Sequence, residues 1–263
     1  MPGRSQPAFC HNHPEGSLRR QLVVDAPRQE GGDILKVFVR GLNACLQRKA
    51  DLQRYKLYLL DNGHEVVPTV EEADAILLWT CAFRQDQHDN SLRAIDGYQG
   101  LPQELIVCGC LPSINPEALA AHHKGSFFHW KEQDEGLARL FGKTKGTVSE
   151  YDRAFMERCL PTDLESFRRD NPLVKVGYTD QFLKMYISEG CEFKCTYCAE
   201  RLAFPAYASV SRERLVERCR RLIAETGQKR VVLWADSLGD YGHERGDSFP
   251  KLLDDLITSV KVV

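Results

Sequence analysis

The sequence of 263 residues lacks the marks of a membrane or secreted protein. No apolar run approaches the ~18 residues that a membrane-spanning helix needs. The first residues, MPGRSQPAFCHNHPEGS, have no apolar core of the kind found in signal peptides. The formal net charge is −2, so the chain as a whole has no electrostatic attraction for nucleic acids or membranes. These absences predict a cytoplasmic protein without a membrane partner.

Several sequence patterns that would indicate a function are also missing. There is no internal repeat of a cysteine motif, no low-complexity segment, and no pair of cysteine motifs at zinc-finger spacing. No His–Asp or His–Cys constellation suggests acid–base or nucleophilic catalysis. The sequence does contain ten cysteines. Because a reducing cytosol disfavours disulfides, metal ligation explains these thiols better than disulfide pairing does.

The order of apolar segments predicts an α/β protein. Buried strands are expected at ILKVFVRG, ADAILLWTC and ELIVCGC, separated by a helix over about 44–62 and another at DQHDNSLRAIDGY. This alternation predicts a doubly wound parallel-sheet domain over 34–145, with a flexible tail at 1–33. In such sheets, ligands bind at the carboxyl ends of the strands.

A second alternation is expected over 179–263, after a linker at 146–178. It consists of the strand FLKMYISEG, the helix SRERLVERCRRLIAETG, the strand KRVVLWAD and the helix SFPKLLDDLITSV. Gly227 is expected to close the first of these helices, and Pro250 to lie in the first turn of the second. The stretch GCEFKCTYC follows the first strand of this segment.

That stretch places Cys191, Cys195 and Cys198 at the spacing C-x3-C-x2-C on one loop. A structural zinc site needs four ligands, usually in two separated pairs. A [4Fe–4S] cluster held by three thiolates leaves its fourth iron open. An open iron can bind a small molecule that carries an amine and a carboxylate. The spacing therefore favours a cluster over a zinc site or incidental thiols.

With Tyr197 before its last cysteine, this motif resembles that of the radical S-adenosylmethionine superfamily. The segments GLNAC, WTCAFR and CGCLP resemble the three single-cysteine motifs of the methylthiotransferase family, and NGHEV is similar to that family's AGYEV. The resemblance runs from about residue 35 to the end of the chain. It implies that the first alternation is the family's N-terminal domain and that 179–263 is the first part of a radical-domain (βα) barrel.

The resemblance implies two [4Fe–4S] clusters and bound S-adenosylmethionine. The first cluster would lie on Cys191, Cys195 and Cys198, and Tyr197, Asp236 and Ser237 would border the S-adenosylmethionine site. The auxiliary cluster would lie on three cysteines, one from each single-cysteine motif of the first domain, namely Cys45, Cys81 and Cys110. Cys110 is preferred to Cys108 because it follows Gly109, as in the family's Gly-Cys motif. Cys159 and Cys219 match no motif.

The family's reaction inserts a methylthio group into an unactivated C–H bond. Reductive cleavage of S-adenosylmethionine at the first cluster gives a 5′-deoxyadenosyl radical, which takes a hydrogen atom from the substrate. The auxiliary cluster would carry the methylated sulfur to the substrate radical. An electron donor such as flavodoxin or ferredoxin is implied. Asp236 is expected near the methionine end of S-adenosylmethionine, the alternative being an exposed carboxylate at a strand end.

Two segments resemble the subgroup that modifies threonylcarbamoyl-adenosine in tRNA. These are CAERLAFPAYASVSRERL and LWADSLGDYGHERG, the second being similar to the subgroup's SEDTGAYGRDIG. The resemblance implies C2 of a modified adenosine in tRNA as the target. Two positions depart from the pattern, since Phe204-Pro205 replaces Arg-Gly and Asp236 replaces Glu or Gln.

A run of arginines fits either contacts with RNA phosphates or a solvated helix face with interleaved glutamates. The run consists of Arg212, Arg214, Arg218, Arg220 and Arg221, with Glu213 and Glu217 between them.

Three alternatives to a tRNA-modifying enzyme remain open. The chain could modify a ribosomal protein or another peptide, carry electrons as a non-catalytic iron–sulfur protein, or serve as a scaffold that binds a partner. The later strands of the family's barrel and its TRAM domain have no counterpart in the sequence. A parallel sheet that stops after two βα units leaves an open edge. We therefore expect either a fragment or a chain whose barrel is completed by a second chain.

Overall fold

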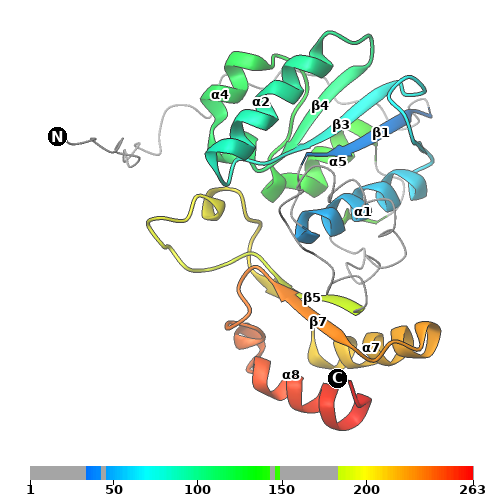
Figure 1. Cartoon of the computed structure of the whole chain (residues 1–263), viewed down its shortest axis with the longest axis vertical. Helices are drawn as coiled ribbons and strands as arrows, with labels where there is room; N and C mark the ends of the chain where they lie inside the picture. The colour runs from blue at the N-terminus through cyan, green and yellow to red at the C-terminus, as the bar shows by residue number, and fades with distance from the viewer. Residues whose placement is uncertain (1–33, 43–45, 143–145, 149–182, 263) are drawn as a thin grey trace, which may run out of the picture.

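The computed structural model describes residues 34–42, 46–142, 146–148 and 183–262. Within these ranges the chain forms two sheets, each with its own helices (Figure 1). The predicted tail and nearly all of the predicted linker lie outside the described residues, and so do Cys45 and Cys159. None of the described helices is long and apolar enough to span a membrane.

The first sheet is parallel throughout, in the order β2-β1-β3-β4. Its strands are β1 (Lys36–Gly41), β2 (Glu65–Val67), β3 (Ala75–Thr80) and β4 (Glu104–Gly109). All six residues of β3 are buried, because both faces of this central strand are covered. A strand buried on both faces is a nearly continuous apolar run, which is why β3 is evident in the sequence. The edge strand β2 has three residues and was not predicted.

Helices cover both faces of this sheet, which confirms the predicted doubly wound α/β domain (Figure 1). On one face lie α1 (Leu46–Asp61) and α5 (Gln133–Phe141), around an aromatic core that contains Tyr55, Trp79 and Trp130. On the other face lie α2 (Gln85–Gln99) and α4 (Pro116–His122), over a core that contains Ile76 and Ile95. The short helix α3 (Leu111–Ile114) follows β4 directly.

The buried face of α1 differs from the one that its apolar residues suggest. Tyr55, Tyr58 and Leu59 are buried, whereas Leu60 is 53% exposed. Charged residues of the same helix, Arg48, Asp51 and Arg54, are at most 3% exposed. They are buried because the second sheet and its loops pack against this side of the helix.

The second sheet is small and mixed, in the order β6-β5-β7. β5 (Leu183–Glu189) pairs in parallel with β7 (Val231–Ala235), as expected for the start of a (βα) barrel. β6 (Ala208–Ser209) was not expected and pairs with β5 in the antiparallel direction. The reason is that the chain turns back after the cysteine loop, so that two of its residues can complete the edge of β5. The prediction of a purely parallel segment is corrected accordingly.

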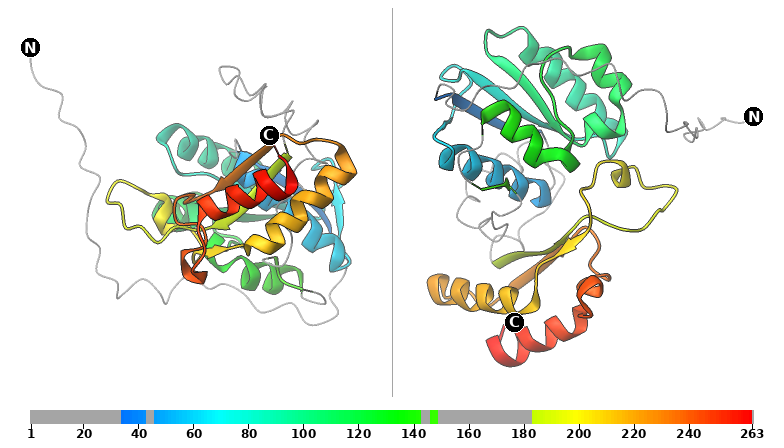
Figure 2. Two further views of the ribbon diagram at one scale, coloured as in Figure 1. Left: turned by 90° about the horizontal axis from the view of Figure 1, so that it is seen from below. Right: turned by 180° about the vertical axis from the view of Figure 1, so that it is seen from behind.

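Two helices cover one face of this second sheet (Figure 2). α7 (Arg212–Thr226) begins at the N-cap Ser211 and ends at Gly227, which adopts the left-handed conformation as predicted. α8 (Phe249–Asp255) has Pro250 in its first turn, also as predicted, and continues as the π-helix η7 (Leu256–Val260). Alternate residues of β5, such as Met185, pack against these helices.

The opposite face of the second sheet lies toward the first domain (Figures 1 and 2). It carries Lys184, Tyr186 and Ser188, all buried. Phe204, from the loop that follows the three cysteines, packs against Trp130 with ring centroids 5.5 Å apart. The aromatic core under the first sheet therefore extends into the loop of the second.

Gly109 is required where β4 ends, and its replacement gives a test of this sheet. Its φ is +94°, and a Cβ there would lie 2.4 Å from the carbonyl oxygen of Thr80. Gly109→Ala should lower the free energy of unfolding by about 3 kcal/mol, because left-handed strain adds to the clash with a backbone atom. Urea denaturation measures the change.

Gly97 supplies the matched control, because it is exposed on α2 and a Cβ there would meet no atom within 4 Å. Gly97→Ala should be neutral or raise the free energy of unfolding by roughly 0.5–1 kcal/mol. Equal stability of the two variants would contradict the close approach of Gly109 to Thr80.

Candidate iron–sulfur site

The loop that carries Cys191, Cys195 and Cys198 begins at Gly190, directly after β5. Gly190 has a φ of +76°, and a Cβ there would lie 2.6 Å from the carbonyl oxygen of Pro205. The glycine therefore lets the start of the loop lie against the returning segment. Apart from one tight turn, residues 190–198 form no helix or strand.

The three thiols of this loop are free and partly exposed. The N–H of Cys198 donates to the carbonyl of Cys195 at 3.1 Å, so these two residues lie at the ends of one turn. Tyr197 is 89% exposed, and its hydroxyl hydrogen bond with Cys195 raises the pKa of Tyr197. Three accessible thiols on one irregular loop fit the donor set of a cluster with one open iron. Among the described residues, no three cysteine, histidine or acidic side chains already converge as metal ligands.

Cys81 and Cys110 lie side by side at the carboxyl edge of the first sheet. Cys81 follows the last residue of β3, and Cys110 follows the last residue of β4. The N–H of Cys110 donates to the carbonyl of Thr80 at 3.0 Å, which continues the register of the two strands beyond their ends. The structure thus brings together two of the three cysteines expected to hold the auxiliary cluster, while Cys45 lies outside the described residues.

The surroundings of Cys108 differ from those of Cys110. Cys108 lies within β4, is fully buried, and its thiol contacts the carbonyl of Leu78 at 3.6 Å. Burial raises the pKa of the Cys108 thiol well above its ordinary value, which disfavours the thiolate that a metal requires. Cys110 lies past the strand, at the N-cap position of α3. These surroundings favour Cys110 as the ligand.

Ser91 of α2 contacts both the N–H and the carbonyl group of Cys81. Its Oγ accepts the N–H of Cys81 at 3.0 Å and lies 2.7 Å from the carbonyl oxygen of Cys81, to which it can donate. Ser91 has no exposed surface. Burial raises the pKa of the Cys81 thiol, the N–H of Phe83 opposes that rise, and Glu200 adds to it.

The segment that follows the cysteine loop packs beside the end of the first sheet, which brings the two cysteine regions close in space. Glu200 begins the short helix η5 (Glu200–Leu202), two residues after Cys198. η5 contacts α3, which starts directly after Cys110. Burial raises the pKa of the Glu200 carboxyl, which Arg48 lowers and Asp236 raises. The carboxyl ends of the first sheet and the cysteine loop of the second therefore adjoin.

Asp236 lies at the end of β7 and is not an exposed carboxylate, since its side chain is 1% exposed. Its Oδ1 accepts from Arg48 at 2.5 Å and from the hydroxyl of Tyr186 at 3.2 Å. Its Oδ2 accepts from the N–H of Gly190 at 2.9 Å, one residue before Cys191. The alternative of an exposed strand-end carboxylate is therefore wrong. The expected contact with S-adenosylmethionine stays a prediction.

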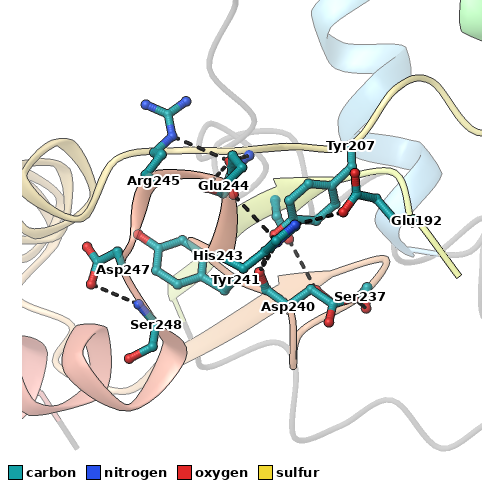
Figure 3. A network of polar contacts seen from close by, with 12 residues as sticks. Glu192, Tyr207, Ser237, Asp240, Tyr241, His243, Glu244, Arg245, Asp247 and Ser248 are labelled. Atoms are coloured by element: carbon teal, nitrogen blue, oxygen red, sulfur yellow. Dashed lines mark hydrogen bonds and ion pairs between the residues drawn. The ribbon is translucent and has the colours of Figure 1, made fainter.

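The loop from β7 to α8 packs beside the cysteine loop (Figure 3). Ser237 donates to the carboxylate of Asp240 at 2.6 Å, and Tyr207 donates to the carbonyl of Asp240 at 2.7 Å. His243 lies 2.7 Å from the carboxylate of Glu192, the residue after Cys191. The hydrogen bond with the Asp240 carbonyl and the nearby Glu192 raise the pKa of His243. These contacts fix the end of β7 against the cysteine loop.

The arginines of α7 do not form one exposed basic face. Arg218 is 5% exposed, and Arg212 is paired with Asp247 at 2.9 Å and with Asp255 at 2.5 Å. Arg220 lies 4.0 Å from Glu217. The five arginines therefore do not share one face, although three of them are exposed.

Two of the residues that shape the site, Ser91 and Arg48, were not singled out from the sequence. Ser91 stands ten positions after Cys81 on a predicted helix, and no pattern marks its contact. Arg48, Asp51 and Arg54 recur at intervals of three residues, which places them on one side of a helix. This spacing could have indicated a charged face that packs against another part of the chain. A charged face exposed to water has the same spacing.

Ser91→Ala tests the clamp on Cys81. The variant leaves buried backbone groups of Cys81 without their partner, which should lower the free energy of unfolding by about 1–3 kcal/mol. The thiol of Cys81 should also react faster with iodoacetamide, as measured by peptide mass spectrometry. Ser126→Ala, which removes a 3.0 Å hydrogen bond to Glu104 at the opposite, amino end of β4, is the control. A Cys81 alkylation rate equal to that of the control would contradict the clamp.

Comparison with known proteins connects these features to a family. The profile of a family described as "Uncharacterized protein family UPF0004" matches residues 37–128, which span the first sheet and both Cys81 and Cys110. Two hundred and fifty-one curated proteins are similar to the chain at a significant level. The chain spans about half the length of the curated relatives that it matches.

One relative is the "Probable threonylcarbamoyladenosine tRNA methylthiotransferase" of Methanocaldococcus jannaschii, 29% identical over 86% of this chain and 50% of that protein. Another is the "Threonylcarbamoyladenosine tRNA methylthiotransferase MtaB" of Aquifex aeolicus, 30% identical over 81% of this chain and 51% of that protein. The "Ribosomal protein uS12 methylthiotransferase RimO" of Protochlamydia amoebophila is 27% identical over 77% of this chain and 41% of that protein. The cysteine motifs and the parallel sheet that carries Cys81 and Cys110 agree with these similarities. Together they show that the chain belongs to the methylthiotransferase family.

Proposed function

We propose that the chain forms the cluster-binding part of a radical S-adenosylmethionine methylthiotransferase that acts on C2 of a modified adenosine in tRNA. The observation that carries this proposal is the closeness of two cysteine sites. Cys81 and Cys110 lie at the carboxyl edge of the first sheet, and η5, which follows the Cys191 loop, packs on α3 next to Cys110. A reaction that needs a radical and a sulfur donor needs two such sites within reach of one substrate.

In this proposal the cysteines of each site hold one [4Fe–4S] cluster. Cys191, Cys195 and Cys198 would hold the first through their thiolates, and Cys45, Cys81 and Cys110 would hold the second. When bound, these clusters would provide the electron for reductive cleavage of S-adenosylmethionine and the sulfur for the product. The chain itself orients these groups: Ser91 fixes Cys81, and Gly190 lets the cysteine loop turn against residue 205.

Three further residues border the proposed S-adenosylmethionine site. Tyr197 stands 89% exposed on the cysteine loop, where its ring is free to pack on a bound molecule. Asp236 and Ser237 follow β7 at the carboxyl end of the sheet, the edge at which barrel enzymes bind their substrates. The amine of S-adenosylmethionine would have to share the Asp236 carboxylate with Arg48, or displace it.

Two relatives named above carry tRNA in their names, which supports tRNA as the substrate class. A second candidate, a ribosomal-protein substrate, is favoured by the similarity to the uS12 enzymes. An electron donor such as flavodoxin or ferredoxin belongs to the same proposal.

Anaerobic reconstitution tests the two clusters. The 263-residue chain should take up about eight iron atoms, four for each cysteine site. The variant with Cys191, Cys195 and Cys198 all replaced by Ala should lose half of the iron and all release of 5′-deoxyadenosine, because the first cluster has no ligands left. Iron is measured by colorimetric assay and 5′-deoxyadenosine by liquid chromatography.

Cys219→Ala is the matched control, because Cys219 is a buried cysteine of α7 away from both sites. It should keep the iron content and the release of 5′-deoxyadenosine. Full iron content in the triple variant would refute the cluster assignment. A product in uS12 rather than in tRNA would keep the reaction class and change the substrate.

A further inference from the structure

Arg48 connects the two halves of the candidate site through a buried ion pair. Its guanidinium donates to Asp236 at 2.5 Å and to Asp51 at 3.2 Å. Its flat face lies 4.0 Å from the ring centroid of Trp130 and 5.5 Å from that of Phe204. Both the pair with Asp236 and the contact with Phe204 join α1 to the second sheet and its loop.

The carboxylate of Asp236 also contacts the backbone at the start of the cysteine loop. Its other oxygen accepts the N–H of Gly190, the residue before Cys191. In the sequence, Arg48 stands three positions after Cys45, a proposed ligand of the other cluster. One guanidinium and one carboxylate thus connect the helix that follows Cys45 with the backbone that precedes Cys191.

A second pair of charges strengthens this junction. Arg54, two turns along α1, lies 3.5 Å from Glu189, the last residue of β5. Asp51 stands between the two arginines and contacts both, at 3.2 and 3.3 Å. Arg48, Asp51 and Arg54 have almost no exposed surface, so water does not weaken their attraction. A guanidinium can make several directed hydrogen bonds at once, which fixes orientation as well as distance.

We propose that the Arg48–Asp236 pair is a positioning element that fixes the start of the Cys191 loop against α1 and so holds the two cysteine sites in a constant relation. This inference rests on the proposed function, in which both sites act on one substrate. Arg48 does not touch the reacting atoms in this arrangement. It acts through Asp236 and through the backbone of Gly190.

Hydrogen exchange of the metal-free, full-length chain tests the pair. Arg48→Met removes the charge and the hydrogen bonds while keeping most of the aliphatic volume. The amide of Gly190 and the peptide over 189–198 should exchange at least tenfold faster, whereas the amides of β4 should keep their rates. General destabilisation of the fold would speed exchange in both segments. Unchanged exchange rates in β4 would therefore distinguish a positioning role of Arg48 from a merely structural one.

Arg84→Met is the matched control. Arg84 also pairs with an aspartate, Asp86 at 2.7 Å, and lies near Cys81, but both members of this pair are largely exposed and belong to the first domain. This variant should leave exchange over 189–198 unchanged. Unchanged exchange at Gly190 in Arg48→Met, or an equal rise in β4, would overturn the proposal.

Arg48→Lys keeps the test decisive if Arg48→Met does not fold by circular dichroism. A lysine retains the charge but not the fork that reaches Asp51 and Asp236 together. Exchange over 189–198 should then rise at least threefold, and a wild-type rate would overturn the proposal.

The iron-loaded chain gives a second readout that separates this inference from the proposed function. Arg48→Met should keep its iron but show a broader distribution of distances between the two clusters by pulsed electron paramagnetic resonance. A wild-type distribution would overturn the positioning role. Failure of the wild-type chain to bind iron would overturn the proposed function instead, while the exchange rates would still decide the role of the pair.

Discussion

Parallel pairing of β3 with β4 is the constraint on which the candidate site depends. Because parallel strands end at the same edge, the residues that follow them become neighbours, although they are far apart in the sequence. Cys81 and Cys110 are such residues, and the hydrogen bond from Cys110 to Thr80 continues the pairing beyond the sheet. Gly109 is necessary to this arrangement because no side chain fits between it and Thr80.

The junction between the two sheets follows a different physical rule. It is formed by aromatic rings and by charges removed from water. The rings of Trp130 and Phe204 meet edge to face, and both lie near the guanidinium of Arg48. Buried charges are costly unless they are paired, so each imposes a defined partner and a defined geometry. Apolar packing alone would allow the sheets to slide. The ion pairs of α1 with Asp236 and Glu189 specify one arrangement.

Much of the fold could be predicted from the sequence because its elements satisfy local rules. β3 is apolar except for its last residue, α7 has a serine cap and a terminal glycine, and α8 has a proline in its first turn. The exceptions have specific reasons. β2 and β6 have three and two residues, too few to show a period, and Leu60 is exposed because α1 turns its charged residues, rather than this leucine, toward the second sheet.

The sequence by itself determined the family and most of the longer strands and helices, because these follow from local patterns of residues, and its cysteine motifs predict the two ligand sets. Only the tertiary structure decided which distant residues meet. It placed Cys110 beyond the end of β4 and beside Thr80, showed Ser91 holding Cys81, and placed Asp236 against Arg48 rather than in water. Contacts of this kind arise from the packing of segments far apart in the chain, and no local pattern records them.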